Sequence, residues 1–413
     1  MRALARTRLA PANPACHWVL QLQQSMPMNT LRGVASKELP CDEATSSLSR
    51  GAAAQNSFQS VMDTAPTPFR FDTDAWSVDE SRFPAGGSNA ERLQFCLNYA
   101  VLAPSCLNTQ PWFFRLNGAA LELFADRSRR LPAADPDGRA LVIACGAALF
   151  NLRCALRYFG LQPNVTLLPW LKDGDPLSGS EVPLARIEVG GESACPAAER
   201  VLFQSIRRRR TYLGAFDPAP ISQNLIDAMQ EQARHEGAWL GILEDAEGKA
   251  DVSQIVAEAD RFHLTQRKCR VELAKWARHG ARLMPPMTAG VLQLGPHGEF
   301  ALPYGAFLDS ALSGHDETDL IESTPLIGVL GADGDTPLDW LRSGQALQRT
   351  VLWARAAGVW ASFLNQPIAH PDSRMRVAHL LDRNYPMLLV RFGRVPATVP
   401  SRAQRSARYV IGR

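Results

Sequence analysis

The chain has 413 residues, of which 46% are hydrophobic and 21% are charged. These values are ordinary for a globular protein and exclude a wholly disordered or collagen-like chain, and the length is that of about two or three domains. The 44 basic and 41 acidic residues leave a net charge of only +3, so there is no general reason to expect nucleic acid or a membrane surface as a partner.

Cysteine usage indicates the compartment. The eight cysteines are scattered along the chain, without a C-x-x-C pair and without a Cys/His cluster of zinc spacing. We therefore expect reduced, buried thiols, a cytoplasmic protein and no metal site. No run approaches the roughly 18 consecutive apolar residues that a membrane-spanning helix requires.

The N-terminal region differs from the rest in composition. Residues 1–60 mix Arg, Ser, Ala, Asn and Pro with little periodicity and contain no apolar core of signal-peptide type. We predict a disordered N-terminal extension over residues 1–71, which an upstream start codon would explain, and a weakly basic transit peptide is the alternative. Folded structure is expected to begin between Asp72 and Ala90.

Apolar periodicity predicts the elements that follow in chain order. Helices are expected at Ala90–Leu102, Ala140–Phe159, Gln223–Glu236, Val252–Arg278 and Gly344–Ala357. Strands are expected at Leu121–Ala125, Val165–Leu168, Ala185–Val189, Leu326–Leu330 and Pro386–Phe392. Residues 295–317 are rich in Gly and Pro and predict a long loop, either a lid over a ligand or a mere connector.

A repeat relates the two parts of the chain. The pattern G-x-A-L, seven residues, then R-x-x-G-[LV] occurs at Gly146 and again at Gly344, an offset of 198 residues (344 − 146). Each copy reads as a helix that its glycine opens and that lies between strand-like runs. Chance could produce one such match, but the matching flanks favour a duplication into two α+β halves, residues 72–200 and 201–413. The two helices should then occupy equivalent positions.

Three polar stretches are candidate binding segments. In residues 103–112 (APSCLNTQPW), two prolines bracket small polar side chains that could read the edge of a planar heterocycle, or merely end a helix. The run Arg207–Arg210 before Thr211 suits a phosphate, since Arg donates in bidentate geometry, although a solvated charge run is the alternative. Residues 362–367 (SFLNQP) form a third polar, proline-ended loop. No G-x-G-x-x-G motif following a strand, Walker loop or Ser-His-Asp motif of hydrolase type is present.

These stretches resemble a known family. The pattern A-P-S-x-x-N-T-Q-P-W is similar to the flavin-contacting segment of the FMN-dependent nitroreductase superfamily, and Arg209-Arg210-Thr211 resembles its R-R-S phosphate motif. More narrowly, segments 126–149 and 344–367 resemble the Acg family, whose members are nitroreductase folds duplicated within one chain. The resemblance covers about residues 88–413 and implies an α+β fold of two nitroreductase-like halves fused as an intramolecular pseudo-dimer.

The resemblance also implies a flavin site shared between the halves. The first half has the P-S-x-x-N loop without an R-R-S motif and the second half has the reverse, which implies one FMN per chain. The phosphate and ribityl end would be held by Arg209, Arg210, Thr211 and Arg405. The ring would be approached from the first half by Pro104, Ser105, Cys106 and Asn108. It would be lined near its reactive N5 by Ser362, Phe363 and Leu364.

One departure from the family pattern bears on function. Nitroreductases commonly carry Lys or Arg two residues after the Ser/Thr of the phosphate motif, near flavin N1, whereas this chain has Leu213. A cation there stabilises the anionic reduced flavin, because negative charge develops at that point. The sequence therefore leaves two functions open. One is an FMN-dependent oxidoreductase that passes electrons from NAD(P)H to a nitroaromatic or quinone; the other is an FMN storage protein with little turnover.

In either case the flavin carries the chemistry and no catalytic side chain is required. The expected partner of the oxidoreductase is a small-molecule electron acceptor. We expect no nucleic acid and no membrane as partners. Because one chain would hold both halves of the interface, a monomer would suffice, although a homodimer is also open.

Overall fold

The computed structural model of the chain describes residues 71–72, 76–169, 182–212, 214–281, 293–294, 300–301, 317–395, 404–405 and 407–411. All of them belong to one unit, Pro68–Arg413. The expected N-terminal extension lies outside the described residues except for Phe71, which is in a strand. Leu213 and most of the 295–317 loop also lie outside them, so those expectations stay predictions.

The first half contains a four-stranded antiparallel sheet. Its strands are β2 (Trp112–Asn117), β3 (Ala120–Ala125), β4 (Leu161–Leu167) and β5 (Ala185–Glu192), in the order β2-β3-β5-β4. The central strand β3 is buried along its whole length, because it pairs with β2 on one side and β5 on the other and packs against helices.

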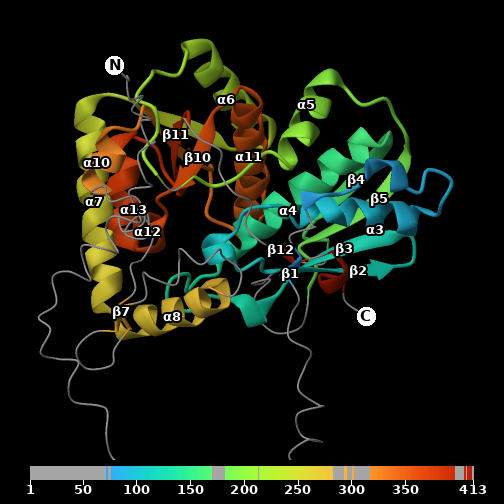
Figure 1. Cartoon of the computed structure of the whole chain (residues 1–413), viewed down its shortest axis with the longest axis horizontal. Coiled ribbons are helices and arrows are strands. Elements are labelled where there is room, and N and C mark those ends of the chain that lie inside the picture. The colour runs from blue at the N-terminus through green and yellow to red at the C-terminus, as the bar shows by residue number, and fades with distance from the viewer. Residues whose placement is uncertain are drawn as a thin grey trace, which may run out of the picture. The chain divides into compact units, whose positions relative to one another are not determined.

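The second half repeats this sheet. Its strands are β6 (Trp239–Leu243), β9 (Leu326–Gly331), β10 (Trp360–Phe363) and β11 (Pro386–Gly393), in the order β10-β11-β9-β6. Taken from the first strand of each half, both sheets have the order first, second, fourth, third, and every pairing is antiparallel. The expected α+β architecture of two halves is therefore confirmed in the topology (Figure 1).

The repeated helices join the two halves. Helices α4 (Arg139–Tyr158) and α11 (Pro337–Ala356) have 20 residues each, and their first residues differ by the same offset of 198 (337 − 139). They pack against each other between the sheets (Figure 1). A Cβ atom built on Gly344 would lie 2.9 Å from the Cα of Gly146, and closer still to the carbonyl oxygen of Ile143. The two glycines therefore let the two backbones approach closely at the centre of the pseudo-dimer.

Helix α4 is also the most apolar long element. Within the described residues it is the one helix long and apolar enough to cross a membrane, and 83% of its apolar window is buried inside the protein. Such burial is typical of a core helix, and here it is produced by α3, α5 and α11 packing against it.

Two expected helices have different bounds. The start of the second repeat helix at Gly344 is wrong: α11 begins at Pro337, where Thr336 and Asp339 form a capping box. The expected single helix Val252–Arg278 is also wrong, because it is divided into α7 (Ala246–Thr265) and α8 (Arg267–Ala281) by an extended Gln266.

The remaining elements connect and cover this framework. The expected boundary between the halves at residue 200 falls inside helix α5 (Ala197–Ile206). The other α-helices are α3 (Asn89–Ala100), α6 (Gln223–His235), α10 (Glu317–Glu322), α12 (Gln366–Ala369) and α13 (Pro371–Leu380). The short strands are β1 (Phe71–Asp72), β7 (Gln293–Leu294), β8 (Phe300–Ala301) and β12 (Gln404–Arg405). The 3-10 helices are η2 (Glu80–Arg82), η3 (Cys106–Asn108), η4 (Arg127–Arg129) and η6 (Ala407–Tyr409).

Segments near the end of the chain cross to the first half. Strand β12 pairs with β1, and beyond it the backbone N–H of Phe114 in β2 donates to the carbonyl of Val410 at 2.6 Å. Ile411 therefore lies beside the free edge of the first sheet, in parallel orientation. This exchange places residues of the second half next to the polar loop that precedes β2.

Candidate functional site

The polar loop between α3 and β2 has an unusual backbone. Leu107, Asn108 and Gln110 have φ angles of 49°, 55° and 49°, in the left-handed region. They are three of the six non-glycine residues with positive φ in the described part of the chain. Leu in this region costs about 1–2 kcal/mol, so the surroundings must hold the loop in shape. Such residues cluster at binding sites, which makes this loop the first candidate.

Gln110 connects the loop to the C-terminal segment. Its backbone N–H donates to Oγ of Ser105 at 2.8 Å, and its side-chain Nε2 donates to the carbonyl of Asn108 at 3.3 Å. Its Oε1 accepts the backbone N–H of Arg405 at 2.7 Å. Gln110 is fully buried, so these hydrogen bonds fix the loop against β12 with little competition from water.

Three arginines donate to carbonyl groups at or next to this loop. Nη2 of Arg209 lies 3.1 Å from the oxygen of Leu102, and Nε of Arg129 lies 2.5 Å from that of Thr109. Nη1 of Arg405 lies 3.2 Å from the oxygen of Gln110. Arg209 and Arg405 come from the second half and are each only 4% exposed. The structure therefore brings together two of the predicted phosphate ligands and the predicted ring-contacting loop.

The arginines make this region strongly positive. Burial and the neighbouring Arg129 lower the pKa of Arg405 to about 10, although Asp126, at 3.7 Å, opposes the shift. Burial and Arg355 likewise lower the pKa of Arg210 to about 10. Both groups stay protonated at neutral pH, and the lowered pKa values reflect burial first and, for each group, repulsion from a different neighbouring arginine second. A bound anion would relieve that repulsion.

Most of the four consecutive arginines, residues 207–210, contact other residues and are not simply exposed to solvent. The guanidinium of Arg210 lies 3.5 Å from the ring centroid of Trp76, a cation–π contact. Arg207 donates to the carbonyl of Val78 and forms an ion pair with Glu80 at 2.5 Å. Arg208 is the exposed member. The other three have specific contacts, so they are part of the packed structure, and Arg209 is the member that reaches the polar loop.

The third predicted segment lies beside Thr211. Thr211 forms a β-bridge with Ala361, which places Ser362 next to the arginine run. Ser362 is fully buried and its Oγ lies 3.3 Å from Nη2 of Arg391. Leu364 packs in an apolar cluster of the second half, so its side chain belongs to the core, and Phe363 is half-buried.

Arg391 was not identified from the sequence. It is a fully buried arginine in β11 that also donates to the carbonyl of Leu320 at 3.0 Å. The sequence feature that could have pointed to it is that Arg391 is the one charged residue in the apolar run 386–393 (PMLLVRFG). A lone charge in a buried strand requires several hydrogen-bond acceptors around it.

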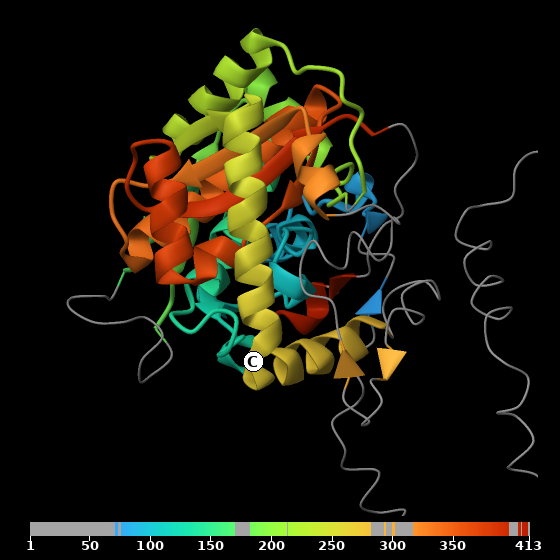
Figure 2. The same cartoon turned by 90° about the vertical axis from the view of Figure 1, so that its left-hand side faces the viewer.

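Helix α8 of the second half covers the loop of the first half. Leu107 of the loop packs in a cluster with Leu131, Leu273 and Trp276. The carboxylate of Glu272 accepts two hydrogen bonds of 3.0 Å from the backbone of residues 133 and 134. Figure 2 shows α8 turning away from the end of α7 to reach this position. The candidate site is thus enclosed by both halves.

The remaining loop residues differ in accessibility. Cys106 is exposed, whereas Pro104, Ser105 and Asn108 are half-buried. The exposed Cys106 and the half-buried Ser105 and Asn108 retain surface that a ligand could contact. A site shared by two halves of identical strand order, with C-terminal residues of the second half lying on the first sheet, defines a pseudo-dimer of the nitroreductase type.

Comparison with known proteins agrees with this class. No family model matches the sequence. A Mycobacterium tuberculosis protein named "Putative NAD(P)H nitroreductase Rv3131" is 30% identical over 318 residues, which cover 75% of this chain and 86% of the relative. "Uncharacterized protein Rv3127" of the same organism is 28% identical over 325 residues, covering 74% of this chain and 88% of that one. "Putative NAD(P)H nitroreductase acg" is 32% identical over 119 residues, 29% of this chain and 34% of the relative.

A solved structure, the FMN-dependent nitroreductase NfnB from Mycobacterium smegmatis in complex with NADPH, matches 49% of this chain and 94% of its own chain. The sequence identity is 15% and the TM-score is 0.34. The family assignment therefore rests on the sequence relatives and not on this structure. This chain belongs to the Acg family of nitroreductase-like proteins.

Replacing Gln110 tests whether the loop is held as described. Gln110→Ala would leave the buried N–H of Arg405 without its acceptor, so we expect the free energy of unfolding to fall by about 1–3 kcal/mol. Chemical denaturation measures this change. The matched control is Gln223→Ala, an exposed glutamine paired with Asp227, which should change stability by less than about 0.5 kcal/mol. Equal stability of the two variants would contradict the role of Gln110.

Proposed function

We propose that the chain binds one FMN where the Ser105–Gln110 loop meets Arg209 and Arg405, and that it passes electrons from NAD(P)H to an electron-poor small molecule such as a nitroaromatic or quinone. The observation that carries this proposal is the convergence of buried arginines of the second half on a strained polar loop of the first. The nitroreductase names of the relatives support the reaction class.

The residues present fit a flavin phosphate and ring. A phosphate dianion would stabilise the partly buried charges of Arg210 and Arg405, and Arg209, Arg210 and Arg405 are its proposed charge-assisted donors. Ser105 and Asn108 offer hydroxyl and amide groups to the polar edge of a ring. When bound, FMN supplies the hydride and electron chemistry, and the side chains bind and orient it.

The two halves differ in the length of the segment that precedes their first sheet strand, and this difference supports one flavin per chain. The first half has the long loop 101–111 between α3 and β2, whereas residues 236–238 connect α6 to β6 in the second half. The second half therefore has no counterpart of the polar loop, and we infer a single flavin per chain.

An absorption spectrum of the purified full-length protein tests the cofactor. We expect flavin bands and, after extraction, FMN at about one per chain. Protein that is colourless as purified and still colourless after incubation with FMN and gel filtration would contradict the proposal.

Storage of FMN with little turnover is the second candidate. The observation that favours it is Leu213, where nitroreductases commonly carry a cation. Steady-state oxidation of NADH and NADPH, with nitrofurazone or menadione as the acceptor, separates the two. Rapid turnover supports the oxidoreductase, and FMN-loaded protein without acceptor-dependent oxidation supports storage.

Replacing Leu213 tests the missing cation. Leu213→Lys is expected to raise the flavin reduction potential, because a cation about 4 Å from the developing anion contributes on the order of a few kcal/mol at an effective dielectric constant near 20. Leu213→Met serves as the uncharged control of similar volume. Redox titration of the two FMN-loaded variants measures the difference. An unchanged potential in folded Leu213→Lys would remove Leu213 from the choice between the functions.

Because one chain contains both halves, a monomer in the cytoplasm is the proposed working form. Light scattering of the FMN-loaded protein tests the oligomeric state. A requirement for dimerisation before FMN binds would contradict it.

A further inference from the structure

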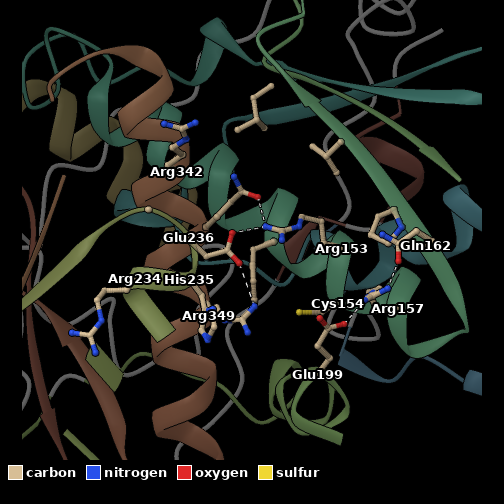
Figure 3. A pocket seen from close by; sticks show the side chains of 16 residues that line it. Arg153, Cys154, Arg157, Gln162, Glu199, Arg234, His235, Glu236, Arg342 and Arg349 are labelled. Atoms are coloured by element: carbon tan, nitrogen blue, oxygen red, sulfur yellow. Dashed lines mark hydrogen bonds and ion pairs between the residues drawn. The ribbon is translucent and has the colours of Figure 1, made fainter. Parts of the chain in front are cut away.

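A cavity lies beside the helix pair α4 and α11. It has a volume of about 770 Å³ and is formed by α4, α11, β4, the start of α5 and the turn between α6 and β6 (Figure 3). We propose that this cavity binds a ligand with adjacent phosphate groups. Such a site lies outside the proposed flavin site and is independent of the proposed redox activity.

The charge of the lining points to an anion. Five arginines line the cavity against two glutamates, so the formal charge is positive even with His235 neutral. The arginines are Arg153, Arg157, Arg234, Arg342 and Arg349. In a concave site such charges raise the local concentration of anions, and Arg matches phosphate oxygens in bidentate geometry.

A buried carboxylate lies at the centre of the cluster. Glu236, whose side chain is 7% exposed, is 2.6 Å from Nη1 of Arg153 and 3.3 Å from Nη1 of Arg349. Figure 3 shows the carboxylate between these two side chains. Nη1 of Arg153 also donates to Oε1 of Gln345 at 2.6 Å, and Nε of Arg349 to Gln232 at 2.8 Å. The two guanidinium groups are therefore held in place before any ligand arrives.

The arginines still have donors to offer. A guanidinium has five N–H groups. Among the described residues, Nη2 of Arg153 and Nη2 of Arg349 have no hydrogen-bond acceptor in the protein. Arg342 is exposed, lines the cavity beside Gly237, and has no ion pair or hydrogen bond to any residue that the structure describes. These groups can bind a phosphate without breaking the existing pairs.

The duplication explains why a cavity exists here. The turn 236–238 stands where the first half has its polar loop, and β4 stands where the second half has β10. The cavity is thus the counterpart of the candidate flavin site, a correspondence that rests on the proposed function. Because the turn is short, no loop fills the space, and Glu236 is the acidic group that faces the arginines.

The spread of the arginines favours more than one phosphate group. Arg153 and Arg349 lie at the centre, Arg342 lies beside Gly237, and Arg157 is bound to Glu199 at 2.8 Å elsewhere in the cavity. The volume lies within the range of small-molecule sites, roughly 300–1,000 Å³. Inorganic pyrophosphate and a nucleoside diphosphate share this chemistry.

Calorimetric titration of the full chain as purified, with or without bound FMN, tests the proposal. The ligands are pyrophosphate, ADP and adenosine. We expect pyrophosphate and ADP to bind with dissociation constants below about 1 mM and adenosine not to bind. Tighter binding of ADP identifies a nucleotide as the source of the phosphates, and tighter binding of pyrophosphate identifies the free anion.

Two variants with opposite expected effects locate the site. Arg342→Gln should weaken pyrophosphate binding by about fivefold to tenfold, because it removes one charged donor. Glu236→Gln should strengthen it by a similar factor of about five, because it removes the competing negative charge while keeping a hydrogen-bonding side chain. Arg261→Gln, an exposed arginine of α7 that does not line the cavity, is the control and should leave affinity unchanged.

The proposal is overturned if neither pyrophosphate nor ADP binds at about 10 mM. It is also overturned if Arg342→Gln and Glu236→Gln both leave the affinity of the wild type unchanged. A chain that fails to take up FMN would contradict the flavin proposal only, because the two variants lie outside the flavin site.

Discussion

Gly344→Ala is expected to lower the free energy of unfolding by about 3 kcal/mol, the upper end of the usual cost of overpacking. The added Cβ would lie 2.9 Å from the Cα of Gly146 and 2.8 Å from the carbonyl carbon of Ile143. Both neighbours are backbone atoms of a 20-residue helix, so neither moves without shifting α4. In an open helix the same change would stabilise by roughly 0.5–1 kcal/mol, so the expected sign is reversed.

Chemical denaturation of the variant, with Gly86→Ala as the control, measures this cost. A Cβ on Gly86 would meet no atom within 4 Å, so that variant should be close to the wild type. Gly146→Ala should resemble Gly344→Ala, and the double variant should cost less than the sum, because both changes force the same pair of helices apart. A Gly344→Ala protein as stable as the wild type would mean that the helices do not cross at these glycines.

The same glycines show what the sequence could and could not predict. Their constant offset predicted two equivalent helices, and the two sheets have the same strand order. The prediction that each glycine opens its helix is wrong, because both glycines lie inside helices, where the two backbones touch. The true start of α11 had a local signal, Thr336 followed by Pro337 and Asp339.

The break at Gln266 had no such signal. Neither Gly nor Pro interrupts residues 252–278, and the two helices differ in what they cover. Helix α7 packs on its own half, whereas α8 packs on Leu107 and Leu131 of the other half. Packing of α8 on the other half therefore decides where the helix breaks, in spite of the local helix propensity. The local sequence pattern carries no information about that packing.

The candidate site was predictable to a similar extent. The polar loop and the arginine run were identified from short motifs, and the structure links them through Arg209. Gln110, Arg129 and Arg391 were not assigned, because each has partners far away in sequence or buried in another strand. The arginine-lined cavity draws on five elements, and no local window of the sequence contains it.

Replacing Arg209 and Arg210 together with Ala is expected to weaken FMN binding by about 2–5 kcal/mol. That loss corresponds to a factor of about 30 to several thousand in the dissociation constant. The physical reason is the loss of two charge-assisted donors at a phosphate. Riboflavin lacks the phosphate, so its affinity should change far less. Titration of apoprotein with each flavin, followed by flavin fluorescence, measures both affinities.

The two arginines should not contribute equally. Arg209 also donates to the carbonyl of Leu102, so its loss loosens the loop of the first half and should weaken riboflavin somewhat as well. Arg210 lies on the ring of Trp76, so Arg210→Ala should weaken FMN binding much more than riboflavin binding. Arg209→Lys keeps the charge but not the forked geometry, and is expected to lie between the wild type and Arg209→Ala.

Arg208 provides the matched control within the same run. It is exposed, so Arg208→Ala removes the same charge from the sequence without touching the loop or Trp76, and both flavins should bind as they do to the wild type. Equal losses of FMN and riboflavin in the double variant would show that the run only supports the fold. A loss much larger for FMN than for riboflavin, absent in Arg208→Ala, would place the phosphate at Arg209 and Arg210, where the second half meets the polar loop of the first.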